Sequence, residues 1–307
     1  MFFRRPRLPR RHALTMLLLL LGLSASHSAV AQTVRYPRFP REIGKVPEGF
    51  NPSVLLKEAL RRANPGLTAV PYDYAEATST SRVYREAIAG KNVDVIWKPT
   101  TLERERDLLP VRIPIDKGLF GWRVALIRSE DLGEFSKIQN LEQLASKRAG
   151  LGFDWADRSI MEANQLPVVT APHYQLLFGM LQAKRFDYFP RSLAEVGAEA
   201  PQYANSGIVI EPSFAIHYPF AVYFFVNRNN AALAEDIRKG LELMLADGSF
   251  QKQFVKQHSA ILQRLNLVQR HVIELKNPLL PSATPLQRKE LWFQPSGSKS
   301  VLFLKAP

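Results

Sequence analysis

Along the first third of the chain, short apolar runs alternate with segments whose apolar positions recur at helical spacing. Strands are predicted at residues 33–36, 67–72 and 93–97, and helices are predicted from Pro52 onward and over 82–89. Proline, glycine, asparagine and hydroxyl residues separate these segments and mark short connecting loops. Such a strand–helix alternation favours an α/β unit on a parallel sheet, in which ligands bind at the carboxyl ends of the strands.

A second alternation follows a change of pattern near residue 111. Extended segments at 111–115 and 122–127 come first, and they predict a crossover rather than a further strand–helix unit. The helices predicted next are 138–145, 156–163, 174–183 and 193–203, and the strands are 148–153, 168–170 and 186–189. The pattern ends with strands at 208–210 and 220–226 and helices at 231–246 and 248–257. One α/β unit inserted into another predicts two lobes joined by two crossings, which permits hinge motion.

The N-terminus has the pattern of a secretory signal peptide over residues 1–31. Arginines precede an apolar stretch from Ala13 to Leu23, and Ala29-Val30-Ala31 provides the small residues that signal peptidase reads. We therefore predict cleavage after Ala31 and a periplasmic location. The alternative is an N-terminal membrane anchor, although the apolar run is short for a bilayer span.

The last segment, residues 276–307, is rich in proline but keeps apolar side chains such as Trp292 and Phe293. We predict an extended tail that packs on a lobe. A disordered tail is the alternative, because proline-rich composition is common in chain ends without a core.

Composition and charge narrow the possible functions. The chain has 307 residues, of which 46% are hydrophobic and 22% charged, with no cysteine and a net charge of +13. The lack of cysteine excludes disulfides, thiol catalysis and cysteine-based metal sites. Five of the positive charges lie in the predicted signal peptide, which leaves about +8 on the rest. Because these charges are scattered, we expect no nucleic-acid binding; the excess fits an anionic small ligand, or solubility alone.

Signatures of catalysis are absent from the sequence. There is no glycine-rich phosphate loop, no G-x-S-x-G and no H-E-x-x-H. Asp154 and Asp157 could form a carboxylate pair, but near a predicted helix start they are more typical of capping and dipole interactions. The histidines after residue 31 form no close pairs; they are His173, His217, His258 and His271. We therefore expect no enzyme activity, no metal and no cofactor.

The strand at 93–97 leads into a turn whose residue types suit a small anion. Thr100-x-x-Glu103 fits a capping box, so a short helix is predicted to begin here with free N–H groups. Arg104 lies just inside that turn and can direct two donors to a carboxylate. The alternative is that Glu103, Arg104, Glu105 and Arg106 form a solvated charge run.

The order of these segments resembles the type II periplasmic solute-binding proteins, and within them the family-3 group that includes binders of polar amino acids. Val93–Ile96, Thr101–Arg104 and Pro114 are similar to the family's strand, its T-x-x-R turn and its following F-S-x-P-Y segment. Further matches are residues 141–144, 147–152, 186–189 and 250–252. The resemblance spans about residues 33–264, and the order of the motifs is more specific than any one of them.

The resemblance implies one familiar and one altered half of a binding site. It makes Arg104 the clamp for a ligand carboxylate, beside Thr100 and Thr101 of the same turn, with Trp97 and Tyr36 at strand ends that line the cleft. In place of the family's Gly-Thr-Thr turn stands Asp154-Trp155-Ala156. Ser192, preceded by Arg191, takes the place of the acid that holds an amine. The predicted ligand-binding residues are Tyr36, Trp97, Thr100, Thr101, Arg104, Asp154, Trp155, Arg191 and Ser192.

These observations predict a specific fold, organisation and function. The expected fold is α/β, with two lobes of mixed sheets flanked by helices and a two-strand hinge. Lobe 1 would comprise residues 32–115 and 206–275, lobe 2 residues 116–205, and the tail residues 276–307. The resemblance implies a monomer that closes on a small polar, carboxylate-bearing ligand and delivers it to an ABC permease. The ligand would have separated negative charges, or an amine that meets Asp154. Alternatives are a sensor for a membrane signalling partner, or an enzyme similar to the cyclohexadienyl dehydratases.

Overall fold

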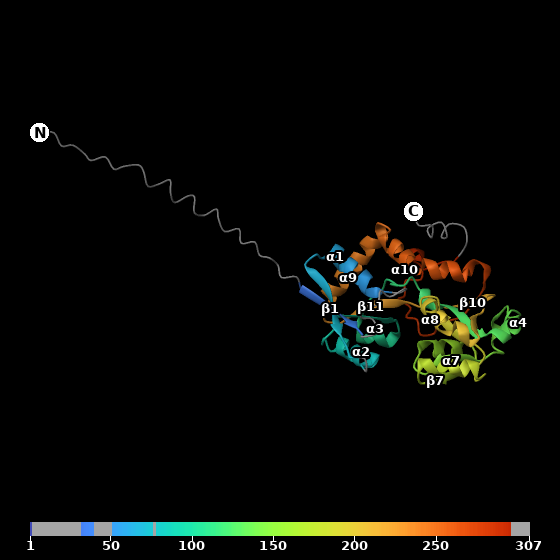
Figure 1. The fold of residues 1–307 in the computed structure, drawn as a ribbon. Coiled ribbons are helices and arrows are strands. Elements are labelled where there is room, and N and C mark those ends of the chain that lie inside the picture. Colours follow the sequence, from blue (N-terminus) through green and yellow to red (C-terminus); the bar gives the residue numbers. More distant parts are fainter. Residues whose placement is uncertain (2–31, 40–50, 76–77, 296–307) are drawn as a thin grey trace. The chain divides into compact units, whose positions relative to one another are not determined.

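Apart from Met1, the computed structural model describes residues 32–39, 51–75 and 78–295 (Figure 1). The predicted signal peptide and its cleavage site fall outside these residues, as does the end of the predicted tail. Within the described ranges, no helix is both long and apolar enough to cross a membrane.

The first part of the described chain contains two small sheets. Its elements are β1 (Gln32–Arg38), α1 (Pro52–Ala63), β2 (Leu67–Asp73), α2 (Thr80–Ile88), β3 (Val95–Pro99), α3 (Leu102–Asp107) and β4 (Leu109–Val111). Strands β1 and β2 pair in parallel, with α1 as the crossover between them. Strand β3 pairs antiparallel with β11 (Val222–Val226), which also pairs antiparallel with β4. The parallel sheet predicted for this part is therefore wrong in this respect, because a late strand inserts between β3 and β4.

A second group of strands centres on β5 (Trp122–Arg128), six of whose seven residues are buried. The elements after it are α4 (Leu132–Phe135), α5 (Leu141–Leu144), β6 (Ala149–Gly152), α6 (Ala156–Ala163), β7 (Val168–Ala171), α7 (Tyr174–Gln182), β8 (Phe189–Ser192), α8 (Val196–Tyr203), β9 (Ile208–Ile210) and β10 (Phe214–His217). Strand β5 pairs antiparallel with β8, β9 and β10, while β6 and β7 form a separate parallel pair. The chain then passes through β11, α9 (Ala231–Ala246), α10 (Ser249–Leu265) and β12 (His271–Glu274).

Sheet pairing also bears on the expected lobe boundaries. Strands β9, β10 and β12 share a sheet with β5 and β8. Residues 208–217 and 271–274, which we assigned to lobe 1, therefore pair with the segment assigned to lobe 2. The chain joins β11, in the other sheet, only after Tyr218.

Several predicted elements differ from the observed ones. The strand predicted at 186–189 lies at Phe189–Ser192, because β8 pairs there with residues 123–126 of β5. Arg191 and Ser192 are buried in this strand although both are polar. The predicted helix 138–145 contracts to α5, and β10 and β12 were not predicted. Periodicity fails here because the strands are short and two buried positions are not apolar.

Close packing of α1 on α9 fixes one side of the core (Figure 1). A Cβ atom at Gly240 would overlap the backbone of Ala59, so only glycine permits this approach of the two helices. Strand β11 is buried along its whole length and carries Tyr223, Phe224 and Phe225 between β3 and β4. The ends of β3 and β4 are thereby held in a rigid sheet.

Residues 276–295, which we call the C-terminal strap, pack along segments that connect the sheets. The Asn277 amide donates to the Pro219 carbonyl, between β10 and β11, at 2.8 Å. Near its other end, the Phe293 N–H donates to the Lys117 carbonyl, between β4 and β5, at 2.7 Å. The strap thus contacts two of the segments by which the chain passes between the β11 sheet and the β5 sheet.

Trp292 is the main apolar contact of the strap. Its ring lies so close to Gly118 that a Cβ atom there would come within 2.6 Å, and its indole N–H donates to the Pro285 carbonyl at 3.0 Å. Gly118 has a φ of +72°, which glycine adopts without strain. Beside it, the Lys117 ammonium donates to the Gln251 side chain and the Glu290 carbonyl, each at 2.8 Å.

We expect Trp292→Ala to destabilise the protein by about 2–3 kcal/mol, because a half-buried indole and one hydrogen bond are lost. Guanidinium denaturation followed by circular dichroism measures the change. Val268→Ala, at an exposed apolar position, is the control and should change the free energy of unfolding by less than about 0.5 kcal/mol. Equal effects of the two substitutions would show that the strap does not stabilise the fold.

Candidate functional site

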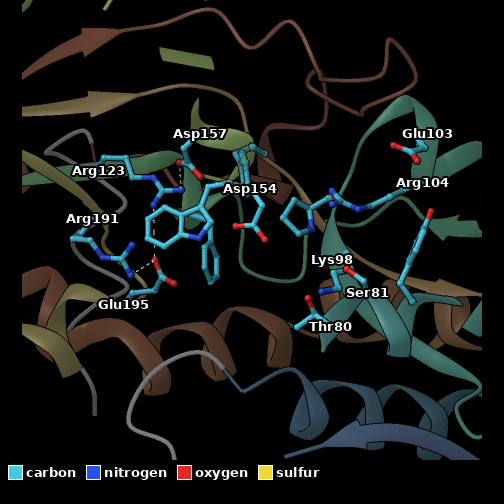
Figure 2. Close-up of a pocket in the computed structure, with 16 residues that line it drawn as sticks. Thr80, Ser81, Lys98, Glu103, Arg104, Arg123, Asp154, Asp157, Arg191 and Glu195 are labelled. Atoms are coloured by element: carbon cyan, nitrogen blue, oxygen red, sulfur yellow. Dashed lines mark hydrogen bonds and ion pairs between the residues drawn. The ribbon is translucent and has the colours of Figure 1, made fainter. Parts of the chain in front are cut away.

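A cavity of about 520 Å³ lies between the ends of several of these elements (Figure 2). One group of lining residues comes from β3, α2 and α3, and a second comes from the segment after β6 and from α6, β5 and β8. The lining residues are Thr80, Ser81, Tyr84, Lys98, Pro99, Glu103, Arg104, Phe120, Arg123, Asp154, Trp155, Ala156, Asp157, Arg191, Glu195 and Phe220.

Arg104 reaches the cavity from the first turn of α3. The helix begins after Thr101, whose hydroxyl oxygen accepts from the Arg104 N–H at 3.2 Å. The predicted capping residue, Thr100, is therefore wrong by one position. The guanidinium donates to the Pro99 carbonyl at 2.8 Å and forms no ion pair within the described part of the chain. Burial lowers the pKa of Arg104 from its usual value, although the group stays charged.

Lys98 extends from the end of β3 into the same part of the cavity. Its side chain is half-buried, and its ammonium makes no hydrogen bond or ion pair to any residue that the structure describes. Burial and, secondarily, the nearby positive charge of Arg104 lower the pKa of Lys98 to about 8. The carboxylate of Asp154 acts in the opposite direction and raises the pKa of Lys98, so the two charges lie close enough to interact.

Asp154 and Trp155 follow directly after β6, at the end of that strand. The Trp155 indole packs over Gly152, where a Cβ atom would overlap it, and stacks on Phe189 with ring centroids 6.1 Å apart. This packing fixes Trp155 and directs the neighbouring Asp154 toward the cavity, as Figure 2 shows. Among the described residues, the Asp154 carboxylate has no hydrogen-bond or ion-pair partner. It is therefore available to a ligand.

A buried charge network closes the cavity beyond Trp155. Arg123, which is 3% exposed, contacts the Asp157 carboxylate at 2.5 Å and donates to the Tyr218 hydroxyl at 2.9 Å. Arg191, 4% exposed, donates to both oxygens of Glu199 at 2.7 and 2.5 Å. Because both arginines are surrounded by carboxylates, neither presents a free positive charge to a ligand.

The Arg191 guanidinium is also enclosed by rings. Its central carbon lies 5.1 Å from the Trp155 ring centroid and 5.0 Å from that of Phe189. Such cation–π contacts, together with the carboxylates, offset the cost of burying the guanidinium. Burial lowers the pKa of Arg191, but the neighbouring carboxylates of Glu195 and Glu199 raise it by more. The pKa of Arg191 therefore lies above its usual value.

Glu195 connects the two arginines. It lies 3.1 Å from Arg191 and 3.8 Å from Arg123. Burial raises the pKa of Glu195 above its usual value, against the opposing effect of the two arginines. The network thus contains Arg123 and Arg191 against Asp157, Glu195 and Glu199, so it carries no excess of positive charge.

The structure brings together some of the nine predicted residues. Arg104, Asp154, Trp155 and Arg191 line the cavity. Arg191 does so as part of the buried network, in which its charge is paired with Glu195 and Glu199. A neighbouring cavity of about 570 Å³ includes Thr101 in its wall and shares Arg104, Asp154 and Trp155 with the first. Pro278 and Leu279 of the C-terminal strap also border this second cavity.

Of the other four predicted residues, Tyr36, Thr100 and Ser192 are buried and Trp97 is half-buried. Trp97 packs between Tyr36 and Phe224, with ring centroids 6.1 and 6.4 Å away. Thr100 donates to the Glu105 carboxylate at 2.7 Å. Ser192 is fully buried, and its hydroxyl donates to the Leu119 carbonyl at 3.4 Å. None of the four borders either of these two cavities.

Sequence reasoning missed the charged residues that complete the cavity. Lys98 follows Trp97 in the singled-out strand, and its position at a strand end could have been noticed. Arg123 and Glu195 gave no such signal, because an arginine in an apolar strand and a glutamate before a helix are common in any chain. Among the described residues, no group of three or more histidine, aspartate or glutamate side chains is arranged to hold a metal ion.

No family model matches the chain, and no curated protein matches it by sequence. Solved structures do match. An ancestral arginine-binding protein bound to arginine superimposes with a TM-score of 0.51 at 18% identity, over 77% of this chain and 99% of that one. An amino-acid ABC transporter substrate-binding protein from Streptococcus pneumoniae bound to L-arginine gives 0.51 at 15% identity, over 74% and 94%.

A probable amino-acid ABC transporter extracellular-binding protein from Bacillus subtilis gives a TM-score of 0.51 at 18% identity, over 74% of this chain and 99% of that one. The protein therefore has the two-lobed α/β fold of periplasmic solute-binding proteins, in agreement with the predicted fold. At these identities the likeness concerns the fold, and function has to be argued from the cavity.

Proposed function

We propose that the protein is an exported solute-binding protein that holds a small carboxylate-bearing ligand in the cavity between Arg104 and Asp154. The observation that carries this proposal is that Arg104 and Asp154, in one cavity, form no ion pair with any residue that the structure describes. Arg104 therefore has donors for a carboxylate, and Asp154 has a carboxylate for an amine or hydroxyl. A partly enclosed site strengthens both interactions because water competes less for them.

Binding in such a site can be coupled to a change in conformation. Arg104 and Asp154 belong to segments on different sheets, so a ligand that contacts both favours the arrangement in which these segments are close. A membrane permease of the ABC type would recognise this state and accept the ligand. The proteins with the same fold named above include components of amino-acid ABC transporters, which is consistent with such a partner.

A thermal-shift screen of the chain from Gln32 onward tests the proposal. Amino acids and mono-, di- and tricarboxylates are compared for wild type and for Arg104→Ala. We expect at least one carboxylate to raise the melting temperature of wild type and to lose that effect in the variant. Stabilisation that survives the substitution, or stabilisation only by ligands without a carboxylate, would contradict the proposal.

An enzyme on the same fold is the second candidate, because Asp154 is an acid in the cavity wall with no hydrogen-bond or ion-pair partner among the residues that the structure describes. It would have to transfer a proton to a leaving hydroxyl, as a dehydratase similar to the cyclohexadienyl dehydratases does. Turnover of prephenate or arogenate by wild type, lost in Asp154→Asn, would establish this function. Absence of turnover at high protein concentration leaves binding as the function.

A further inference from the structure

Lys98 and Arg104 are two positive charges in the cavity that form no ion pair with any described residue. Arg123 and Arg191 contact carboxylates within 2.5 Å, whereas neither Lys98 nor Arg104 contacts a carboxylate among the described residues. Glu103, the acid next to Arg104 in the chain, also lines the cavity and acts to raise the pKa of Arg104, but it is exposed, so water screens its charge. Two like charges that are partly removed from water repel each other and are stabilised by an added anion.

The groups around Lys98 do not supply enough negative charge to balance Lys98 and Arg104, so we look to a ligand for the missing anion. Arg104 from α3 repels it and Asp154, after β6, attracts it. Thr80, Ser81 and Tyr84 of α2 also line the cavity. The Tyr84 hydroxyl donates to Asp107 at 3.1 Å, and burial raises its pKa to about 12, so it is neutral. Asp154 alone cannot balance both cations.

We propose that Lys98 is a second ligand-binding cation, and that the site takes a ligand with two carboxylates, one for Arg104 and one for Lys98. This inference rests on the proposed function and makes the ligand class specific. Together with Asp154, the three charges sum to +1. An acidic amino acid balances them completely, because its two carboxylates meet the two cations and its ammonium meets Asp154. A dicarboxylate without an amine neutralises both cations but leaves Asp154 without a cation. A ligand with one carboxylate leaves Lys98 to Asp154, and a basic amino acid adds a further positive charge.

The inference also predicts a dependence on pH. The ligand binds the protonated form of Lys98, so affinity is highest below the pKa of about 8 and falls as pH rises through it. From pH 7 to pH 9 the protonated fraction of such a group falls about tenfold, and Kd should rise by about the same factor. Arg104 stays charged over this range, so without Lys98 the affinity would change little.

Isothermal titration of the protein from Gln32 onward tests the inference, with succinate, glutarate, aspartate and glutamate as the two-carboxylate probes. Butyrate and arginine are the comparison ligands. We expect a two-carboxylate probe to bind at least tenfold more tightly than either comparison ligand. Lys98→Met should weaken its binding about tenfold or more at pH 7 and remove the pH dependence. Lys98→Arg should retain binding but lose the decline toward pH 9, because arginine does not titrate there.

Lys91→Met, at an exposed position in the loop before β3, is the matched control and should bind as wild type does. Melting temperatures without ligand establish that each variant is folded. If binding requires Arg104 but is unchanged by Lys98→Met and by pH, the inference fails and the proposed function stands. If neither Arg104→Ala nor Lys98→Met affects binding, both fail. If no two-carboxylate probe binds, the inference is overturned.

Discussion

Replacing Arg104 by alanine should weaken ligand binding by about 30-fold or more. The guanidinium is partly buried, and within the described part of the chain it donates one hydrogen bond, to the Pro99 carbonyl, so its other donors are available to a ligand. Removing one partner of a desolvated, hydrogen-bonded charge pair costs about 2–5 kcal/mol of binding free energy. Calorimetric titration of wild type and Arg104→Ala with the ligand from the thermal-shift screen measures this loss.

Arg106→Ala is the control for this experiment. Arg106 lies in the same helix but is exposed and paired with Asp107 at 3.1 Å, outside the cavity. Its substitution should leave Kd within about twofold, since an exposed pair contributes little. Equal losses in the two variants would indicate a general effect of charge and would contradict a clamp at Arg104.

Replacing Asp157 by alanine should lower the free energy of unfolding by about 3–5 kcal/mol. Arg123 and Asp157 are 3% and 8% exposed, and they contact each other and Tyr218. Without Asp157, the buried Arg123 guanidinium loses its nearest counter-ion, which is the most costly way to disrupt a buried pair. Guanidinium denaturation measures this change, and the melting temperature should fall by about 10 °C.

Arg158→Ala provides a matched comparison on the same helix. Arg158 pairs with Glu162 at 2.8 Å, but both side chains are more than one-third exposed. Water screens this pair, so we expect a change of less than about 1 kcal/mol. A similarly small effect of Asp157→Ala would show that the network beyond Trp155 does not hold the wall of the cavity.

The order of helices and strands could be predicted where the apolar pattern is long. Strand β5 and helices α1 and α9 have many apolar positions at a regular spacing, so their existence was evident. The strand predicted at 186–189 lies three residues before the observed β8, because three of the four residues of β8 are Pro190, Arg191 and Ser192, which do not read as an apolar strand. Strand β10 was missed, since four residues carry little periodic signal. These short strands form because they pair with β5, which is distant from them in the sequence.

The candidate site could be predicted in part. Arg104 is predicted from the turn after the strand at 93–97 and from its likeness to the T-x-x-R motif. Asp154 and Trp155 are predicted from the place of the family's Gly-Thr-Thr turn, at the end of a strand, where an α/β fold binds its ligands. Trp97 and Tyr36 lie within β3 and β1, and their rings pack on each other and do not line the cavity. Arg123 and Asp157 form an ion pair although they lie 34 positions apart in the sequence, so no local pattern predicts this contact. Only the folded chain reveals that Arg191 is neutralised and that Lys98 is not.

The most direct test of a carboxylate site between Arg104 and Asp154 is a crystal structure of the protein with the ligand that stabilises it most. We predict that the ligand lies in the cavity of Figure 2, with a carboxylate within about 3 Å of the Arg104 guanidinium. Its remaining polar groups should lie toward Lys98 and Asp154. A ligand bound elsewhere, or one that directs an apolar or cationic group at Arg104, would contradict the proposed function.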